Sequence, residues 1–270
     1  MLSSDKTGFV KSNWIGVRTL SRLKPILSKA DKQRIKLENR YATRIGDALQ
    51  EMLRKSLRSE KDVPNLVQRM RETSGLLKEQ LLEMYTAASN LGVEVGQTLV
   101  ETAVGMPTVK QDLPLNINWA MANVHVLEWA ARESEAIFAE LLGTNAKELS
   151  AELVLWLEGG APLSDLKKTL SKGRWFGKAR GKMIAVTEVT RAYNEGNMAA
   201  YRESGVVTGK EFQTARDEHV CSICAPLDGK ITELEGTFET PFGIENFQKP
   251  PVHVNCRCVL APITRRFQRV

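Results

Sequence analysis

Apolar residues recur every three or four positions through much of the chain, and this spacing predicts amphipathic helices. One series ends at Met52, and a second predicts a single helix from about Asn65 to Val104, roughly 60 Å long. A helix of that length is expected to pack against partner helices. Within it, Gly92 and Gly96 form a GxxxG pair, which predicts a close helix crossing. The two series are Leu37, Tyr41, Ile45, Ala48 and Met52, and then Leu77, Leu81, Met84, Ala88, Leu91, Val95 and Leu99.

Prolines at positions 25, 64, 107, 114 and 162 are expected to separate the helices. A third apolar series predicts a helix with Asn116 as its N-cap. Asn145–Leu157 predicts a shorter helix, ended by Gly159-Gly160. Lys182–Glu203 predicts the last one, with Gly205 as its left-handed terminator. The third series is Ile117, Met121, Val124, Leu127, Ala131, Phe138 and Leu141.

Beyond Gly205 the pattern changes to short β-prone pieces separated by turns rich in Gly and Pro. The pieces are Val206–Thr208, Phe212–Thr214 and Val259–Ile263. We therefore expect a mainly α fold, in which an elongated helical body (1–175) carries a small C-terminal α/β (α+β) domain (176–270). The boundary is expected near residues 160–180.

Composition agrees with a globular protein: 42% of the 270 residues are apolar and 26% are charged. No apolar run approaches the ~20 residues that cross a bilayer, so we expect no membrane contact. The first 14 residues contain no apolar stretch of the kind that a secretory signal requires. We expect a soluble protein that starts in the cytosol.

The charge is distributed in blocks along the chain. Residues 1–60 carry a net charge of +8, residues 61–160 carry −7, residues 161–210 carry +6 and residues 211–270 carry −1, which together make the total of +6. Such blocks suit contact with a polyanion or with charged neighbours in an assembly. Ordinary solvated helix faces are the alternative interpretation.

The densest basic run lies between residues 167 and 182 and contains Trp175 and Phe176. Basic residues interleaved with aromatic ones can contact phosphates and stack on bases. A loop whose aromatic side chains fill the core explains the run equally well. The candidate nucleic-acid-binding residues are Lys167, Lys168, Lys172, Arg174, Lys178, Arg180 and Lys182.

Five potential metal ligands occur in two short motifs: Cys221 and Cys224 as CxxC, and His253, Cys256 and Cys258 as HxxCxC. Tetrahedral Zn²⁺ takes four such ligands, so zinc is the candidate cofactor. Two alternatives stay open. The cysteines can pack as small apolar side chains, or form disulfides once the protein leaves the reducing cytosol. Redox catalysis is not expected, because a turn follows Cys224 where a thioredoxin-type site needs a helix N-terminus.

The sequence predicts no enzyme. It contains no recognisable nucleophile motif and no Gly-rich phosphate loop, so no small-molecule substrate is expected. His125 and His219 are isolated histidines, and we interpret both as structural.

The last third of the chain resembles a known family. The helix Thr187–Gly196 is followed, in order, by Phe212-Gln213-Thr214, Asp217, Cys221-Ser222-Ile223-Cys224, Leu227-Asp228-Gly229, Pro250-Pro251-Val252-His253 and Cys256-Arg257-Cys258. Together these motifs resemble the Mu-F-like domain of tailed phages, over roughly residues 181–262. Phe212 stands where Trp or Tyr is common, and Glu218-His219 replaces a more usual basic residue. The first 180 residues match no motif.

The resemblance implies a minor head protein of a tailed phage, which acts in head morphogenesis at the portal vertex. Portal protein and other head proteins are then its expected partners, and double-stranded DNA is a further one. The expected location is the virion, and the host cytoplasm during assembly. The alternative is a DNA-binding protein with a zinc-knuckle tail that acts in DNA packaging or ejection.

The motif also contains charged residues with helical spacing. Glu188, Arg191 and Glu195 are expected to form a ladder that fixes their helix on the cysteine sheet. Arg257 is expected to pair with Asp217 or Asp228. We interpret these polar residues mainly as stabilising a small fold.

Overall fold

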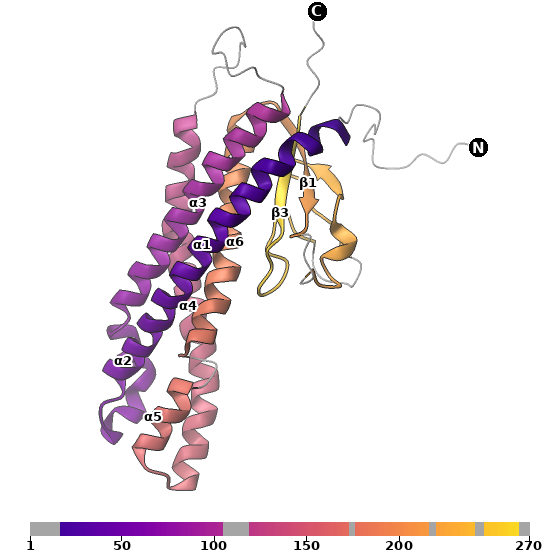
Figure 1. Ribbon diagram of the computed structural model, residues 1–270. Coiled ribbons are helices and arrows are strands. Elements are labelled where there is room, and N and C mark those ends of the chain that lie inside the picture. Colours follow the sequence, from indigo (N-terminus) through magenta and orange to yellow (C-terminus); the bar gives the residue numbers. More distant parts are fainter. Residues whose placement is uncertain (1–16, 105–118, 173–175, 216–219, 241–245, 265–270) are drawn as a thin grey trace, which may run out of the picture.

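The computed structural model describes residues 17–104, 119–172, 176–215, 220–240 and 246–264. The fold is mainly α with a small antiparallel sheet near the C-terminus, as predicted (Figure 1). The helices are α1 (Val17–Ser56), α2 (Leu66–Glu72), α3 (Gly75–Ala103), α4 (Trp119–Gly159), α5 (Leu163–Lys172) and α6 (Lys178–Glu203), with short 3₁₀ turns η2 (Glu60–Asn65) and η3 (Ala225–Leu227). The strands are β1 (Val207–Gln213), β2 (Ile231–Glu233) and β3 (Val259–Thr264).

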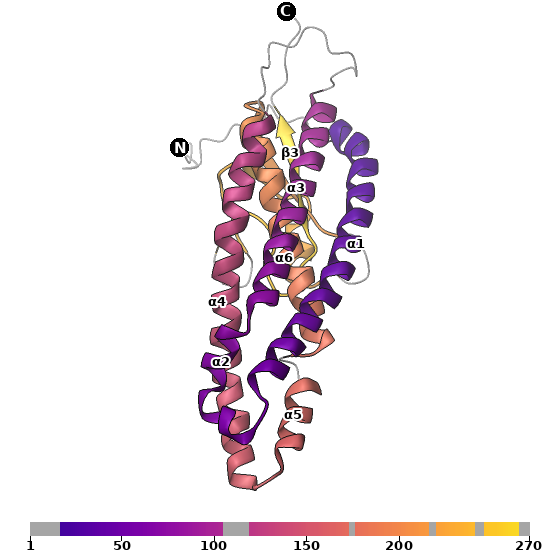
Figure 2. The same cartoon turned by 90° about the vertical axis from the view of Figure 1, so that its left-hand side faces the viewer.

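The long helices form an elongated bundle in which α3 and α6 pack against each other at the centre. Helices α1 and α4 lie on opposite sides of this pair (Figure 2). The largest apolar core extends along the bundle and includes Ile45 on α1, Leu81 on α3, Phe138 on α4 and Val189 on α6. Among the described residues, no helix is both long and apolar enough to cross a membrane.

Helix α6 contributes to two cores. Its first half (Ile184, Ala185, Val189) packs in the bundle, whereas Met198 and Tyr201 pack in a second core with the cysteines and the sheet. The predicted division into 1–175 and 176–270 stays a prediction. Helix α6 belongs to the second region, but its first half packs in the core of the first region.

The predicted single helix from Asn65 to Val104 is wrong, because α2 ends at Glu72 and α3 begins at Gly75. The hydroxyl groups at the break compete for backbone acceptors. Thr73 Oγ1 donates to the carbonyl of Arg69 at 2.9 Å, and Ser74 Oγ donates to that of Arg71 at 2.6 Å. The chain therefore folds back on itself around the end of α1, where Ser56 Oγ lies 2.7 Å from Thr73 Oγ1.

Two other predicted boundaries are also wrong. Pro25 lies inside α1 rather than before it. Two predicted helices are one, since α4 runs without a break to Gly159. Its predicted end is confirmed: Gly160 has a φ of 60°. Asn116 and Ile117 lie outside the described residues.

The apolar series predicted on α4 is only partly buried. Met121, Val124 and Leu127 are exposed, whereas Ala122 and Val126 are buried. These smaller side chains pack against Val93 of α3 and Ala199 of α6. The close approach of three helices favours small residues at this position, so the buried face differs from the predicted one in the first half of α4. Phe138 and Leu141, further along the helix, are buried as predicted.

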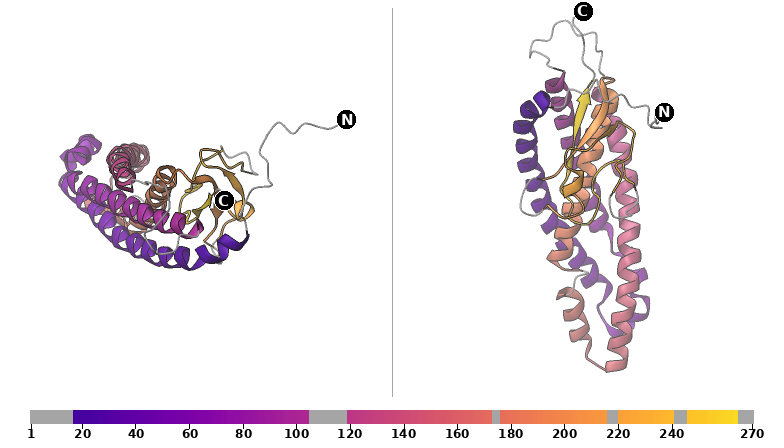
Figure 3. Two further views of the ribbon diagram at one scale, coloured as in Figure 1. Left: turned by 90° about the horizontal axis from the view of Figure 1, so that it is seen from above. Right: turned by 90° about the vertical axis from the view of Figure 1, so that its right-hand side faces the viewer.

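The sheet has the order β2-β1-β3, with both pairs antiparallel. The right-hand view of Figure 3 shows it beside the upper part of the bundle. The two β-prone pieces predicted around residues 206–214 are one strand, β1, and β2 was not predicted. Hydrogen bonds fasten β3 to α6: Tyr201 Oη donates to the carbonyl of Leu260 at 2.9 Å, and Asn194 Nδ2 donates to that of Cys258 at 3.1 Å. The predicted end of α6 is confirmed, and Gly205 has a φ of 62°.

Candidate metal centre

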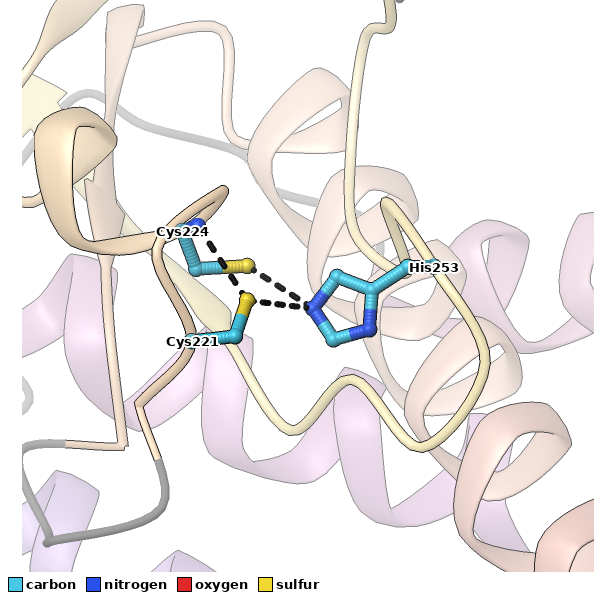
Figure 4. A group of neighbouring side chains, drawn as sticks. All are labelled: Cys221, Cys224 and His253. Carbon is cyan, nitrogen blue, oxygen red and sulfur yellow. Dashed lines mark hydrogen bonds between the residues drawn. The ribbon is translucent and has the colours of Figure 1, made fainter.

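The five predicted ligands come from two segments that the sheet brings together. Cys221 and Cys224 lie in the turn just before η3, and Cys256 and Cys258 lie just before β3. His253 follows the cis peptide bond between Pro250 and Pro251. Figure 4 shows the His253 ring pointing at the sulfurs of the CxxC turn.

His253 and the CxxC turn form one group of three ligand atoms. His253 Nε2 lies 3.0 Å from the Sγ of Cys221 and 3.2 Å from that of Cys224. His253 Nδ1 lies 2.8 Å from the carbonyl oxygen of Val254. Because a carbonyl oxygen only accepts hydrogen bonds, the proton belongs on Nδ1, which leaves the Nε2 lone pair facing the sulfurs. This is the arrangement that orients histidine ligands in metal sites.

Cys224 also belongs to a second group with Cys256 and Cys258, whose ligand atoms all lie within 4.8 Å of one another. The Sγ atoms of Cys224 and Cys256 are 4.0 Å apart. Hydrogen bonds from the Cys224 and Cys258 thiols lower the pKa of Cys256, so the cluster favours a thiolate at that sulfur. Thiolate is the form of cysteine that binds metals.

The geometry fits a tetrahedral metal. Zn–S bonds of about 2.3 Å and Zn–N bonds of about 2.0–2.1 Å place neighbouring ligand atoms about 3.5–3.8 Å apart. The observed separations of 3.0, 3.2 and 4.0 Å bracket that range. The cluster could therefore hold a metal ion, and because the two groups share only Cys224, a fourth ligand would have to move toward the other three.

The structure is consistent with apolar packing of the cysteines and contains no disulfide between them. Cys224, Cys256 and Cys258 are buried in the second core, beside Phe212 and Leu227, as apolar packing requires. All four thiols are free. The 4.0 Å separation of Cys224 and Cys256 is about twice the S–S bond length of a disulfide.

The predicted charged ladder is only partly correct. Arg191 Nε donates to Glu188 Oε2 at 2.7 Å, as expected. The same carboxylate accepts a 2.5 Å hydrogen bond from Tyr85 Oη of α3, and Arg191 lies 3.9 Å from Glu133 of α4. This pair therefore fastens α6 to the bundle and not to the cysteine sheet, because its further partners Tyr85 and Glu133 lie on α3 and α4. Burial and the adjacent Glu188 carboxylate raise the pKa of Tyr85 far above its usual value.

Glu195 is the member of the ladder that links α6 to the C-terminal domain, as was predicted for all three residues. It forms ion pairs with Lys249 at 2.8 Å and with Arg202 at 3.3 Å. Arg202 in turn forms a bidentate ion pair with Glu235, at 2.8 and 3.1 Å. Sequence reasoning missed Arg202, Glu235 and Lys249. The seven-residue spacing of Glu195 and Arg202, two turns of one helix face, was the available signal.

Asp228 accepts hydrogen bonds from the backbone N–H and the hydroxyl of Thr214, at 2.8 and 3.0 Å. It thereby holds the turn after η3 against the end of β1. Asp217 lies outside the described residues. The pairing of Arg257 with one of these two carboxylates stays a prediction.

The predicted nucleic-acid-binding residues lie on two helices. Lys167, Lys168 and Lys172 are on α5, and Lys178, Arg180 and Lys182 are on α6, while Arg174 and Trp175 lie outside the described residues. Lys167 Nζ donates to the carbonyl of Arg58 at 3.1 Å, which links α5 to the end of α1. Phe176 is fully buried in the bundle, as the core-filling alternative expects. Lys168, Lys172, Lys178 and Lys182 are exposed.

The fold and the site together define a helical protein whose small C-terminal sheet domain is organised around a Cys/His cluster. Residues 147–261 match the family described as Phage Mu protein F like protein. The match runs from the C-terminal part of α4 into β3 and confirms the Mu-F-like resemblance of the C-terminal region.

One curated relative extends the comparison. The chain is 25% identical over 189 residues to "Uncharacterized protein YqbB" of Bacillus subtilis (strain 168). The aligned part covers 62% of this chain and 57% of that protein. No solved structure matches the chain.

Proposed function

We propose that this protein is a minor head protein that acts in head morphogenesis of a tailed phage. The observation that carries the proposal is the Mu-F-like match of residues 147–261. That match includes the helix that joins the sheet domain to the bundle, so the domain and its stalk act as one unit. The role is structural and not catalytic. The protein belongs to the phage head, and to the host cytoplasm during assembly.

The proposed partner is the portal protein, at the portal vertex of the head. An elongated bundle with exposed apolar residues on α4 supports docking on another helical assembly. Quantitative mass spectrometry of purified virions and of portal-containing intermediates tests this. A few copies per particle that co-purify with portal protein are the expected result. Heads that assemble normally and stay infectious without the protein would contradict the proposal.

The proposed cofactor is one Zn²⁺ per chain, held by Cys221, Cys224, His253 and Cys256. The unprotonated Nε2 of His253 and the 4.0 Å contact of Cys256 with Cys224 support this choice of four. Cys258 then packs beside the site without binding the metal. A structural zinc contributes its binding free energy to folding, so it would stabilise the junction between the CxxC turn and β3.

A second candidate function is DNA binding during packaging or ejection. It is supported by the positive charge of residues 1–60 and 161–210, where Lys and Arg outnumber Asp and Glu. Elemental analysis and DNA-binding measurements on purified protein separate this candidate from a purely structural role.

A further inference from the structure

Helix α1 exposes a row of basic side chains on the face that points away from the bundle. Its members are Arg22, Lys29, Lys32, Lys36 and Arg40, and all five are exposed. At 3.6 residues per turn they fall within an arc of about 80°, and they extend over about 27 Å of helix. We call these five residues the basic stripe.

The charge of the basic stripe is not neutralised by the rest of the described structure. None of its five residues forms an ion pair or a side-chain hydrogen bond with a described residue. The acidic residues in this part of α1, Asp31 and Glu38, point the other way. Both pair with Arg34, which is only 2% exposed. In this part of α1 the two carboxylates therefore lie on a different side of the helix from the basic stripe.

Helix α6 packs against a different side of α1 from the stripe. It crosses α1 closely, since a Cβ atom on Gly181 would lie 2.5 Å from the carbonyl oxygen of Ala42. Lys178 and Lys182, on either side of Gly181 in the sequence, are exposed. Helix α4, which carries more acidic than basic residues, lies on the opposite side of the bundle (Figure 2). The basic stripe therefore lies on the side of the bundle away from the acidic helix α4.

The chemistry of the stripe fits a phosphate backbone better than a protein surface. Protein interfaces have an apolar centre that is depleted of charged residues. No large apolar side chain is exposed within the arc of the stripe, and the exposed Ile35 lies about 120° away from Lys29 around the helix. Duplex DNA presents one negative charge per ~1.7 Å of its axis, so a straight 27 Å row of cations can follow several successive phosphates.

We propose that the basic stripe of α1 binds the phosphate backbone of duplex DNA, without sequence preference. This inference deepens the second candidate function by assigning it a surface, and it moves that surface from the predicted segment 167–182 to α1. It does not depend on portal association, which is tested on virions and not on purified protein.

The test measures binding of the full chain to a fluorescein-labelled 30-bp duplex by anisotropy, between about 50 and 200 mM salt. Five phosphate contacts predict a slope of log K against log salt of about −4.5. The triple variant Lys29→Gln, Lys32→Gln, Lys36→Gln should lose three contacts, which reduces the slope by about 2.7 and the affinity by at least about tenfold. Circular dichroism confirms that the exposed substitutions leave the fold intact.

A matched control removes the same charge elsewhere. Arg58, Lys61 and Arg71 are exposed near the other end of the bundle, and their replacement by Gln should change the slope by less than one. Equal losses in both triple variants would show a net-charge effect and overturn the proposal. An unchanged slope in the stripe variant would overturn it as well. So would salt-sensitive self-association that the stripe variant abolishes while DNA affinity is unchanged, because the stripe would then be a protein interface.

Discussion

Gly92 of α3 and Gly196 of α6 meet at the point where the two central helices cross. A Cβ atom on Gly92 would lie 2.1 Å from the carbonyl oxygen of Tyr193, and one on Gly196 would lie 2.1 Å from that of Ser89. Gly96 approaches Ala200 and Asn197 one turn further on. The close crossing predicted from the GxxxG pair is confirmed, and its partner surface is the second half of α6. This crossing joins the bundle to the sheet domain.

Replacing Gly196 by alanine should destabilise the protein by about 3 kcal/mol, because two backbones would have to separate to admit the methyl group. Urea unfolding followed by circular dichroism measures the loss. Gly143→Ala is the matched control. Nothing lies within 4 Å of a Cβ there, and alanine should stabilise the middle of α4 by about 0.5–1 kcal/mol. Equal effects at the two sites would mean that the helices do not cross at Gly196.

Removing the Tyr85 hydroxyl should cost about 1.5–3 kcal/mol, because Tyr85→Phe leaves a buried carboxylate with one donor fewer. Urea unfolding is again the measurement. The exposed pair of Arg44 and Glu83 provides the control, since Arg44→Ala should cost less than about 1 kcal/mol. A Tyr85→Phe variant as stable as the parent would show that Glu188 is held by Arg191 alone.

Zinc should be present at about one ion per chain in protein purified under reducing conditions. Cys221→Ser and Cys256→Ser should each abolish it and lower the stability of the C-terminal region, because structural zinc contributes to folding. Elemental analysis and thermal unfolding are the measurements. Cys258→Ser should keep the metal, and so should the neighbouring exposed control Ser222→Ala. If the Cys258→Ser variant loses the metal and the Cys256→Ser variant keeps it, Cys258 is the ligand and Cys256 is not.

Stability should rise with pH above about 8 because of Lys210. Burial lowers the pKa of Lys210 to about 8, although its Nζ donates to the carbonyls of Leu234 and Gly236. Between that value and the ordinary value near 10.5, the unfolded chain binds a proton that the folded chain has released. Stability therefore increases with pH in this window. Below pH 8 both states are protonated, and the cost of the buried charge is constant.

The measurement is the difference in unfolding free energy between the parent and a Lys210→Met variant, followed from pH 7 to pH 10.5. This difference should shift in favour of the parent by at most about 3 kcal/mol, since one pKa unit corresponds to about 1.4 kcal/mol. Other titrating groups are present in both proteins, so their contributions to the pH dependence cancel in this difference. A difference that stays flat across the window would mean that the two carbonyls hold the pKa of Lys210 at its ordinary value.

The sequence alone was sufficient for the features that depend on local spacing. Helical periodicity predicted a mainly α protein, and the paired motifs around Cys221 and Cys256 predicted a common site. Boundaries were predicted less well. The break at Thr73 and Ser74 depends on side-chain hydroxyls that compete for backbone carbonyls, and apolar periodicity carries no sign of that competition.

Only the tertiary structure determined which side chains pair and which are buried, because both depend on which helices and strands are in contact. The sequence shows Tyr85 and Glu188 103 positions apart, and only the α3–α6 crossing brings them within a hydrogen bond. The same crossing selected Ala122 instead of Met121 for the buried side of α4, because three helices approach closely there. The packing of α1 against α6 and α3 buries Arg34 and Glu38 and leaves Lys29 and Lys36 facing solvent. The physical reason is that burial and pairing are properties of contacts, and residues far apart along the chain make most of these contacts.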